Sequence, residues 1–298
     1  MSARTEQPHP QAKGLQSLSP ERAAERLFEA QAAAAATVGA SLSAIARAGE
    51  AAAAAIGGGH RLAYVGAGSS GLMALADALE LAGTFGIPPA RTPVLFAGGT
   101  AALLALTGAV EDDPALAATD LARLAPRAGD VLICVSASGR TPYTVAVADG
   151  ARRSGATVIG LADVAGSPLL ALADIAILLD TGPELVAGST RMGAGTAAKI
   201  ALNLISTLMG LRLGHVHDGY MVNVVADNAK LRDRAARIVA ALAGTDPDRA
   251  AAALAAAGGA VKPAILIAGG AADAAAAQRL LAASGGHVGP ALATLGQD

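Results

Sequence analysis

Residues 61–83 read RLAYVGAGSSGLMALADALELAG, and the order of an apolar run, a glycine turn and an amphipathic segment decides the fold. The run 61–65 predicts a buried strand, the turn contains the pattern G-x-G-x-x-G, and the residues after it predict a helix. Similar apolar runs recur with helical segments between them, at 94–97, 131–135, 157–161 and 175–179. This alternation predicts an α/β fold with a doubly wound, five-stranded parallel sheet flanked by helices.

Helical segments precede and follow the predicted sheet. Ser19, Pro20 and Glu21 supply an N-cap, a proline at the first helical position and an acid in the first turn, so a helical stretch with a break is expected from Pro20 to residue 56. Beyond residue 180 we expect no further strands, but a long helix from near Ser189, a second over 222–242, and then short helices broken by glycines. We therefore divide the chain into a polar lead with helices (1–56), a sheet domain with long helices (57–243) and a small all-helical tail domain (244–298).

Composition narrows the class of partner. The chain has 298 residues and a net charge of -2, from 22 Lys and Arg against 24 Asp and Glu without long runs of either sign, which argues against a nucleic-acid or anionic-membrane partner. The longest uncharged stretch, 92–110, contains Pro93 and Gly98-Gly99, so we reject a transmembrane segment. The N-terminus is polar and has no apolar signal-peptide core. A cytoplasmic protein with a small-molecule partner is expected.

Cysteine and histidine give little sign of redox or metal chemistry. Cys134 is the single cysteine, so no intrachain disulfide can form, and its apolar neighbours predict a buried strand residue and not a catalytic thiol. His215 and His217 are close in sequence, but no carboxylate or thiol stands near them at a familiar metal-ligand spacing. We predict no metal site.

The glycine turn matches a dinucleotide-binding pattern, yet it lacks the pattern's usual partner. A dinucleotide fold places an acid near the end of the second strand to bind the ribose, and here that strand ends in LFAGG. The turn instead carries Ser69 and Ser70, whose hydroxyls and backbone N–H groups at a helix N-terminus suit a bare phosphate. We therefore expect this turn to hold part of a sugar phosphate.

A second turn of the same kind follows the third predicted strand, in DVLICVSASGRTPY (130–143). Carboxyl ends of parallel strands meet at one edge of the sheet, where ligands of such folds bind. A monophosphate site with room for a polyol is indicated, although serines that only cap helices are the alternative. The candidate binding residues of this turn are Ser136, Ser138, Gly139, Arg140 and Thr141.

Three glutamates are candidates for acid-base chemistry. Glu80 lies near the C-terminal end of the predicted helix among apolar neighbours, so burial would raise its pKa and suit it to act as a general acid near neutral pH. Glu111, next to Asp112 and Asp113, reads on the residues alone as part of a solvated acidic loop. Glu184 precedes the long helix and is either a second base or a loop charge.

The motifs taken together resemble one family, the N-acetylmuramic acid 6-phosphate etherases of the sugar isomerase (SIS) domain superfamily. The resemblance covers nearly the whole chain, through VGAGSSG, DALELAGTFG, GAVEDD, SASGRTPY, GPELVAGSTRMGAGTAAKIALNLIST and MVNVVADNAKLRDRA, with RTEQPHP near the start. It implies a lyase that cleaves a lactyl ether by elimination and hydration, without metal or nucleotide, and a homodimer with sites at or near the interface. It also implies catalytic roles for Glu80 as acid and Glu111 as base, with the order of roles open.

The chain departs from the family pattern at several positions. Leu72 and Gly193 stand where the family usually has Arg and Lys, Asn223 replaces an acid, and Leu81-Ala82-Gly83 replaces Cys-Pro-Pro. These departures put lactyl or phosphate recognition in doubt. Two alternatives therefore stay open: a SIS-fold phosphosugar isomerase that uses Glu184, and a sugar-phosphate-sensing regulator resembling the glucokinase regulatory protein.

Overall fold

Five parallel strands form the central sheet, as predicted. Their order in the sheet is β2-β1-β3-β4-β5. The computed structural model describes residues 4–106, 108–224 and 229–296. The strands are β1 (Leu62–Gly66), β2 (Val94–Phe96), β3 (Val131–Val135), β4 (Thr157–Ala162) and β5 (Ile175–Leu178). Gly66 of β1 pairs with Val135 of β3, so these neighbouring strands end side by side. Because β1 lies between β2 and β3, the order reverses here, at the point where doubly wound folds bind ligands.

The chain divides into two compact units. The first comprises the residues up to Leu79 together with Ala90–Ser206, and the second comprises Glu80–Pro89 and the residues from Thr207 onward. Helix α3 (Gly68–Phe85) and helix α8 (Gly193–Arg212) contribute residues to both units. The three-part division expected from the sequence stays a prediction.

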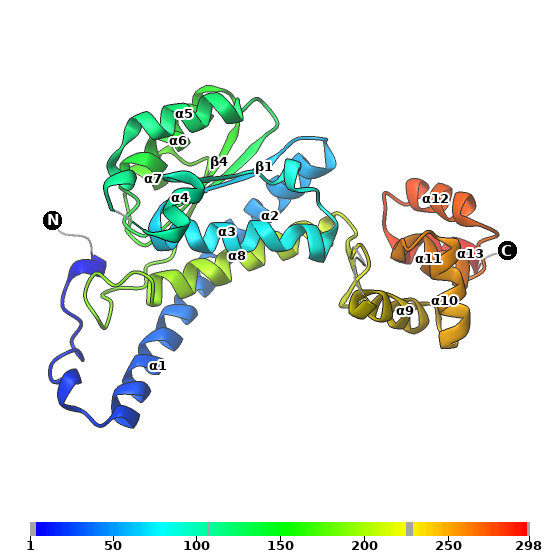
Figure 1. Cartoon of the computed structure of the whole chain (residues 1–298), viewed down its shortest axis with the longest axis horizontal. Coiled ribbons are helices and arrows are strands. Elements are labelled where there is room, and N and C mark those ends of the chain that lie inside the picture. The colour runs from blue at the N-terminus through cyan, green and yellow to red at the C-terminus, as the bar shows by residue number, and fades with distance from the viewer. Residues whose placement is uncertain (1–3, 107, 225–228, 297–298) are drawn as a thin grey trace. The chain divides into compact units, whose positions relative to one another are not determined.

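Helices cover both faces of the sheet in the first unit (Figure 1). Helix α6 (Pro142–Arg153) packs on one face against β1, β3 and β4, and α2 (Leu42–Gly57) packs on the other against β1, β3 and β5. The other helices of this unit are α1 (Pro20–Thr37), α4 (Gly99–Leu104), α5 (Pro114–Leu124) and α7 (Pro168–Leu172), with the 3-10 turns η1 (Arg4–Glu6), η2 (Leu15–Ser17), η3 (Val38–Ser41) and η5 (Gly108–Asp112). The 3-10 turn η4 (Pro89–Arg91) begins in the second unit and ends in the first.

The strands are buried on both faces, which explains their continuous apolar sequences. All five residues of β1 and all five of β3 are buried. On the α6 face, Val65, Cys134 and Val158 pack with Tyr143 and Val147 of the helix. Small residues dominate this core, so helix and sheet approach closely.

The predicted N-terminal helical stretch is present with its break. Helix α1 begins at Pro20, and the Oγ of Ser19 accepts a hydrogen bond from the backbone N–H of Arg22 at 3.4 Å, as an N-cap residue does. The short turn η3 separates α1 from α2.

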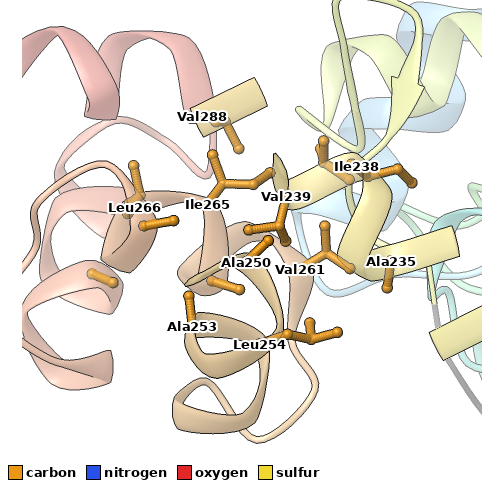
Figure 2. Packing of buried hydrophobic residues seen from close by; sticks show 14 of the residues in the cluster. Ala235, Ile238, Val239, Ala250, Ala253, Leu254, Val261, Ile265, Leu266 and Val288 are labelled. Atoms are coloured by element: carbon orange, nitrogen blue, oxygen red, sulfur yellow. The ribbon is translucent and has the colours of Figure 1, made fainter. Parts of the chain in front are cut away.

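The second unit contains a small helical core of its own. Figure 2 shows Ile238 and Val239 packing with Val261 and Ile265 in this cluster of buried aliphatic side chains. Its helices after α8 are α9 (Ala229–Ala243), α10 (Pro247–Ala256), α11 (Val261–Ala268), α12 (Ala274–Ala283) and α13 (Val288–Leu295).

Two expectations for this part of the chain are wrong. Strands do not stop at residue 180, because β6 (Val216–His217) and β7 (Tyr220–Met221) form a short antiparallel pair. The second long helix begins at Ala229 and not at residue 222, since residues 220–221 are paired in this hairpin. Strands of two residues are too short to leave an apolar pattern in the sequence.

Helix α8 is long and apolar enough to cross a membrane by length and composition alone. More than half of its apolar window is buried inside the protein, as in the core helix of a soluble protein. The stretch 92–110, rejected as a membrane segment, contains β2 and α4.

Candidate active site

Two serine-containing turns lie together at the carboxyl edge of the sheet. The first connects β1 to α3, and the second connects β3 to α6. The Oγ of Ser70 in the first turn accepts a hydrogen bond from the backbone N–H of Ala137 in the second, at 3.3 Å. The sequence therefore predicted the meeting of the turns, since both follow strands that are neighbours in the sheet.

Hydroxyl groups organise the second turn from within. The Oγ of Ser136 is buried and lies 2.8 Å from the Oγ1 of Thr141 and 3.4 Å from the Oγ of Ser138. Gly139 has a φ of +62°, and a Cβ at this position would collide with the Oγ of Ser167. Ser136 and Gly139 thus shape the turn, while Ser138 and Thr141 line an adjacent cavity.

A cavity of about 240 Å³ opens beside the two turns, entirely within the first unit. Hydroxyl and carboxylate side chains form much of its wall, which suits a small polar ligand. Its lining residues are Thr5, Glu6, Ala67, Ser69, Ser70, Glu111, Ala137, Ser138, Thr141 and Thr190.

Glu111 is the acid-base candidate that the structure brings into this cavity. It lies in η5, and an added Cβ on Gly68 would be 2.5 Å from its Oε1, so its carboxylate sits against the first turn. Partial burial, and to a smaller degree the neighbouring charge of Asp112, raise the pKa of Glu111 above its ordinary value. The solvated-loop interpretation of this residue is therefore wrong, because its carboxylate faces a cavity and is partly desolvated.

Glu80 lies on α3 and belongs to the second unit. Its side chain is exposed in the single chain. The burial that its apolar sequence led us to expect is therefore not present in the single chain. The apolar sequence around Glu80 was misleading because its neighbour Leu79 is exposed as well. A pairing of Glu80 with Glu111 stays a prediction.

A buried carboxylate holds the middle of α3 in place. Asp77 accepts hydrogen bonds from the hydroxyl of Tyr64 at 2.8 Å, the side-chain amide of Asn203 at 2.7 Å and the hydroxyl of Ser206 at 3.0 Å. These donors come from β1 and α8. Since a buried carboxylate is stable only when its oxygens have partners, this network fixes the rotation of α3 about its axis.

Two predicted binding residues, Glu184 and Arg140, are not among the residues that line this cavity. The carboxylate of Glu184 is buried and accepts hydrogen bonds from the backbone N–H groups of Gly193 and Ala194, both at 2.9 Å. It therefore stabilises the N-terminus of α8, a favourable place for an anion. Arg140 is exposed, and its guanidinium is not among the groups that line the cavity.

The structure offers no activated thiol. Cys134 is fully buried in β3, and this burial raises its pKa to about 12, so the thiolate is not populated at neutral pH. Within residues 4–106, 108–224 and 229–296, no three His, Cys, Asp or Glu side chains are grouped as metal ligands would be.

The sequence interpretation missed three polar residues of the cavity wall: Thr5, Glu6 and Thr190. Thr5 and Glu6 belong to RTEQPHP, a segment noted for its resemblance but given no role. Thr190 lies in GSTR, ahead of α8, in a stretch also noted for the same resemblance. The described lining contains no Lys or Arg, so hydroxyls, backbone N–H groups and carboxylates define its chemistry.

Comparisons with known proteins agree with this architecture. A sequence profile described as the SIS domain matches residues 28–163, which include both turns and Glu111. The structure of a phosphoheptose isomerase from Francisella tularensis aligns with a TM-score of 0.50 at 20% identity, covering 65% of this chain and 100% of its own. At this identity the likeness shows the fold.

Curated relatives are more similar in sequence. An N-acetylmuramic acid 6-phosphate etherase of Deinococcus radiodurans is 45% identical over 247 residues, which are 83% of this chain and 81% of the relative. The protein of the same name from Streptomyces coelicolor is 43% identical over 235 residues, which are 79% of this chain and 76% of the relative. By this identity and coverage, the chain belongs to the N-acetylmuramic acid 6-phosphate etherase family.

Proposed function

We propose that the protein is a lyase that cleaves the lactyl ether of N-acetylmuramic acid 6-phosphate, releasing D-lactate and N-acetylglucosamine 6-phosphate. One observation carries the proposal: Glu111, with a raised pKa, lies in a small cavity beside two hydroxyl-bearing turns. Family membership at 45% identity supports the same substrate.

The phosphate is expected at the two turns. Ser69 and Ser70 stand in the first turn of α3, which contains no acidic residue, and the N-terminus of a helix favours an anion. Ser138 and Thr141 add hydroxyl donors from the second turn. Ser136 and Gly139 support these donors by fixing the turn, and we assign them that supporting role.

The reaction consists of an elimination followed by a hydration. The ring opens, a base removes the proton at C2 next to the C1 aldehyde, and lactate leaves from C3 with the electron pair of the broken C–O bond. Water then adds its hydroxyl to C3 and a proton to C2, so the net change consumes one water. These steps need only proton transfer, and two carboxylates suffice for them, without a cofactor.

We assign Glu111 as the base at C2 and Glu80 as the acid that protonates the departing lactate oxygen. The raised pKa of Glu111 supports its part, because a stronger base removes a carbon-bound proton more readily. Glu80 needs a site from which water is excluded if it is to act as this acid. Its exposure in a single chain therefore calls for a partner that covers it.

A second copy of this chain is the partner that we propose. Large apolar side chains are exposed near both glutamates in the sequence: Leu79 (68%) precedes Glu80, and Leu104 (91%) and Leu106 (51%) precede η5. Exposed apolar groups of this size favour an interface. Light scattering should therefore give twice the mass of the 28.9 kDa chain, and Leu104→Glu should shift the mass toward that of one chain.

The partners that we propose are a small sugar phosphate and a second copy of this chain. We propose neither a nucleic-acid partner nor a membrane partner. With a net charge of -2 and a substrate that arises from cell-wall material, we expect a cytoplasmic enzyme of amino-sugar metabolism. Fractionation of cells that express the tagged chain would check this location.

A sugar-phosphate-sensing regulator is the second candidate, favoured by one observation. The described lining has no cation, and Leu72 and Gly193 replace the family's usual Arg and Lys. Gly193 is buried, and an added Cβ there would be 3.0 Å from the Oε2 of Glu184, so a longer side chain would disturb this carboxylate. Such a site could bind a sugar phosphate without turning it over. The isomerase alternative is weaker, because Glu184 is engaged with the N-terminus of α8.

The decisive experiment measures D-lactate release from N-acetylmuramic acid 6-phosphate by the wild-type protein and by Glu80→Gln and Glu111→Gln. Glu29→Gln, on the exposed side of α1, is the matched control for loss of one carboxylate. Each active-site variant should lose at least about 100-fold in kcat, as expected for a general acid or base, while the control keeps full activity.

Each outcome separates the candidates. Release by the wild type that persists in Glu111→Gln would overturn the assigned base. No release, combined with a rise in melting temperature on adding the sugar phosphate, would favour the sensor. Formation of a ketose phosphate from an aldose phosphate, abolished in Glu184→Gln, would favour the isomerase.

A further inference from the structure

The N-terminal segment forms part of the cavity wall. Thr5 and Glu6 line the cavity, and Thr5 is only 1% exposed. The carbonyl oxygen of Thr5 accepts a hydrogen bond from the backbone N–H of Gly188 at 2.9 Å. This bond joins residues that are far apart in sequence and holds the segment against the loop that precedes α8.

The loop leaves room for the carboxylate of Glu6. Gly188 has a φ of +76°, and an added Cβ at this position would be 2.7 Å from the Oε2 of Glu6. A residue with a side chain there would push Glu6 away. Thr190, two residues further along, lines the same cavity, so Glu6 is held at a wall that also contains a hydroxyl.

Two carboxylates of the same cavity thus differ in their surroundings. Glu111 is partly desolvated and its pKa is raised, whereas Glu6 is exposed at the wall. An ionised carboxylate only accepts hydrogen bonds, and a phosphate dianion offers it no donor and repels it. Glu6 is therefore suited to the neutral donors of a sugar, which are hydroxyl and amide N–H groups.

We infer that Glu6 is a specificity-determining residue that accepts a hydrogen bond from a hydroxyl or amide N–H group of the bound sugar phosphate. This inference rests on the proposed function and names a contact that orients the sugar between the phosphate turns and Glu111. The role assigned to Glu6 is binding and not proton transfer.

The test measures binding and turnover separately. Isothermal titration of N-acetylglucosamine 6-phosphate, which carries the sugar donors without the lactyl group, is run on the wild type, Glu6→Gln, Glu6→Ala and the control Glu29→Gln. A hydrogen bond to a charged group predicts a loss of affinity on the order of 10-fold for Glu6→Ala, and a smaller loss for Glu6→Gln, whose amide oxygen still accepts. In D-lactate release from N-acetylmuramic acid 6-phosphate, KM should rise while kcat changes less than about 3-fold.

The outcomes distinguish this inference from the proposed function. Affinity of Glu6→Ala within 2-fold of the wild type would overturn the role of Glu6, while lactate release by the wild type would leave the lyase intact. If the wild type releases no lactate but Glu6→Ala still weakens binding, the lyase is overturned and the contact of Glu6 is supported. A wild type that binds no sugar phosphate would overturn both.

Discussion

Asp163 offers a quantitative test of the electrostatics at the carboxyl edge of the sheet. It follows β4 directly, is 3% exposed, and its backbone N–H donates a hydrogen bond to the carbonyl oxygen of Ala137 at 2.9 Å. Its Oδ1 accepts a hydrogen bond from the hydroxyl of Thr181 at 3.0 Å. Burial raises the pKa of Asp163 to about 7, the nearby charges of Glu184 and Asp180 add to the rise, and the bond from Thr181 opposes it.

The raised pKa of Asp163 makes the folded protein less stable as the pH rises. Since the pKa is higher in the folded state than the ordinary value of 3.8, the folded protein retains a proton that the unfolded chain loses between about pH 4 and pH 7. The free energy of unfolding therefore falls as the pH rises through this window, and the penalty is complete above about pH 7. From 3.8 to about 7 the full penalty is on the order of 4 kcal/mol.

Asp163→Asn removes the ionisation and leaves an amide oxygen for Thr181. The free energy of unfolding of the variant minus that of the wild type should therefore increase with pH. This difference should be about 2 to 3 kcal/mol larger at pH 8 than at pH 5. A constant cost of the buried NH₂ group affects both pH values alike and cancels in this comparison. Urea unfolding followed by circular dichroism at the two pH values measures it, with Glu29→Gln as the control at an exposed site. An equal difference at pH 5 and pH 8 would show that Asp163 is ionised throughout and would refute the reasoning.

Two further predictions concern Glu111, the proposed base. Gly68→Ala places a Cβ 2.5 Å from the Oε1 of Glu111, so it should displace this carboxylate and lower kcat by more than 10-fold. Because the φ of Gly68 is +51°, the variant should also lose about 1 to 2 kcal/mol of stability. An unchanged kcat in a folded variant would contradict the contact between Gly68 and Glu111. Asp112→Asn removes a charge that raises the pKa of Glu111, while the larger effect of burial remains. If Glu111 acts as the base, the acid limb of the pH profile of kcat/KM should move to lower pH in this variant, and an acid limb that does not move would argue against Glu111 as the titrating group.

The sequence predicted those parts of the site that depend on local pattern and topology. Apolar runs located all five strands of the main sheet, because strands buried on both faces are continuously apolar. The meeting of the two serine turns followed from strand order alone, since β1 and β3 are neighbours. The bond from Ala137 to Ser70 is the physical result of that order.

Other parts of the site depend on long-range contacts that no local pattern contains. The partial burial of Glu111 comes from the approach of η5 to Gly68, and the place of Glu6 comes from the bond between Thr5 and Gly188. Glu80 illustrates the opposite error: apolar neighbours suggested burial, but the helix exposes Leu79 beside it. Hydrophobic sequence around a residue predicts burial only if the covering partner is part of the same chain.

The absence of Lys and Arg from the described lining bears on catalysis as well as on binding. A phosphate bound by hydroxyls and N–H groups keeps its charge, whereas a phosphate paired with a lysine or arginine would be largely neutralised. If the phosphate binds in this cavity, its negative charge adds to that of Asp112 and raises the pKa of Glu111 further, by an amount that salt reduces. Phosphate binding and activation of Glu111, the proposed base, would then be coupled through the electrostatics of one small cavity. Replacing hydroxyl donors with cations at this edge would strengthen phosphate binding and weaken the base.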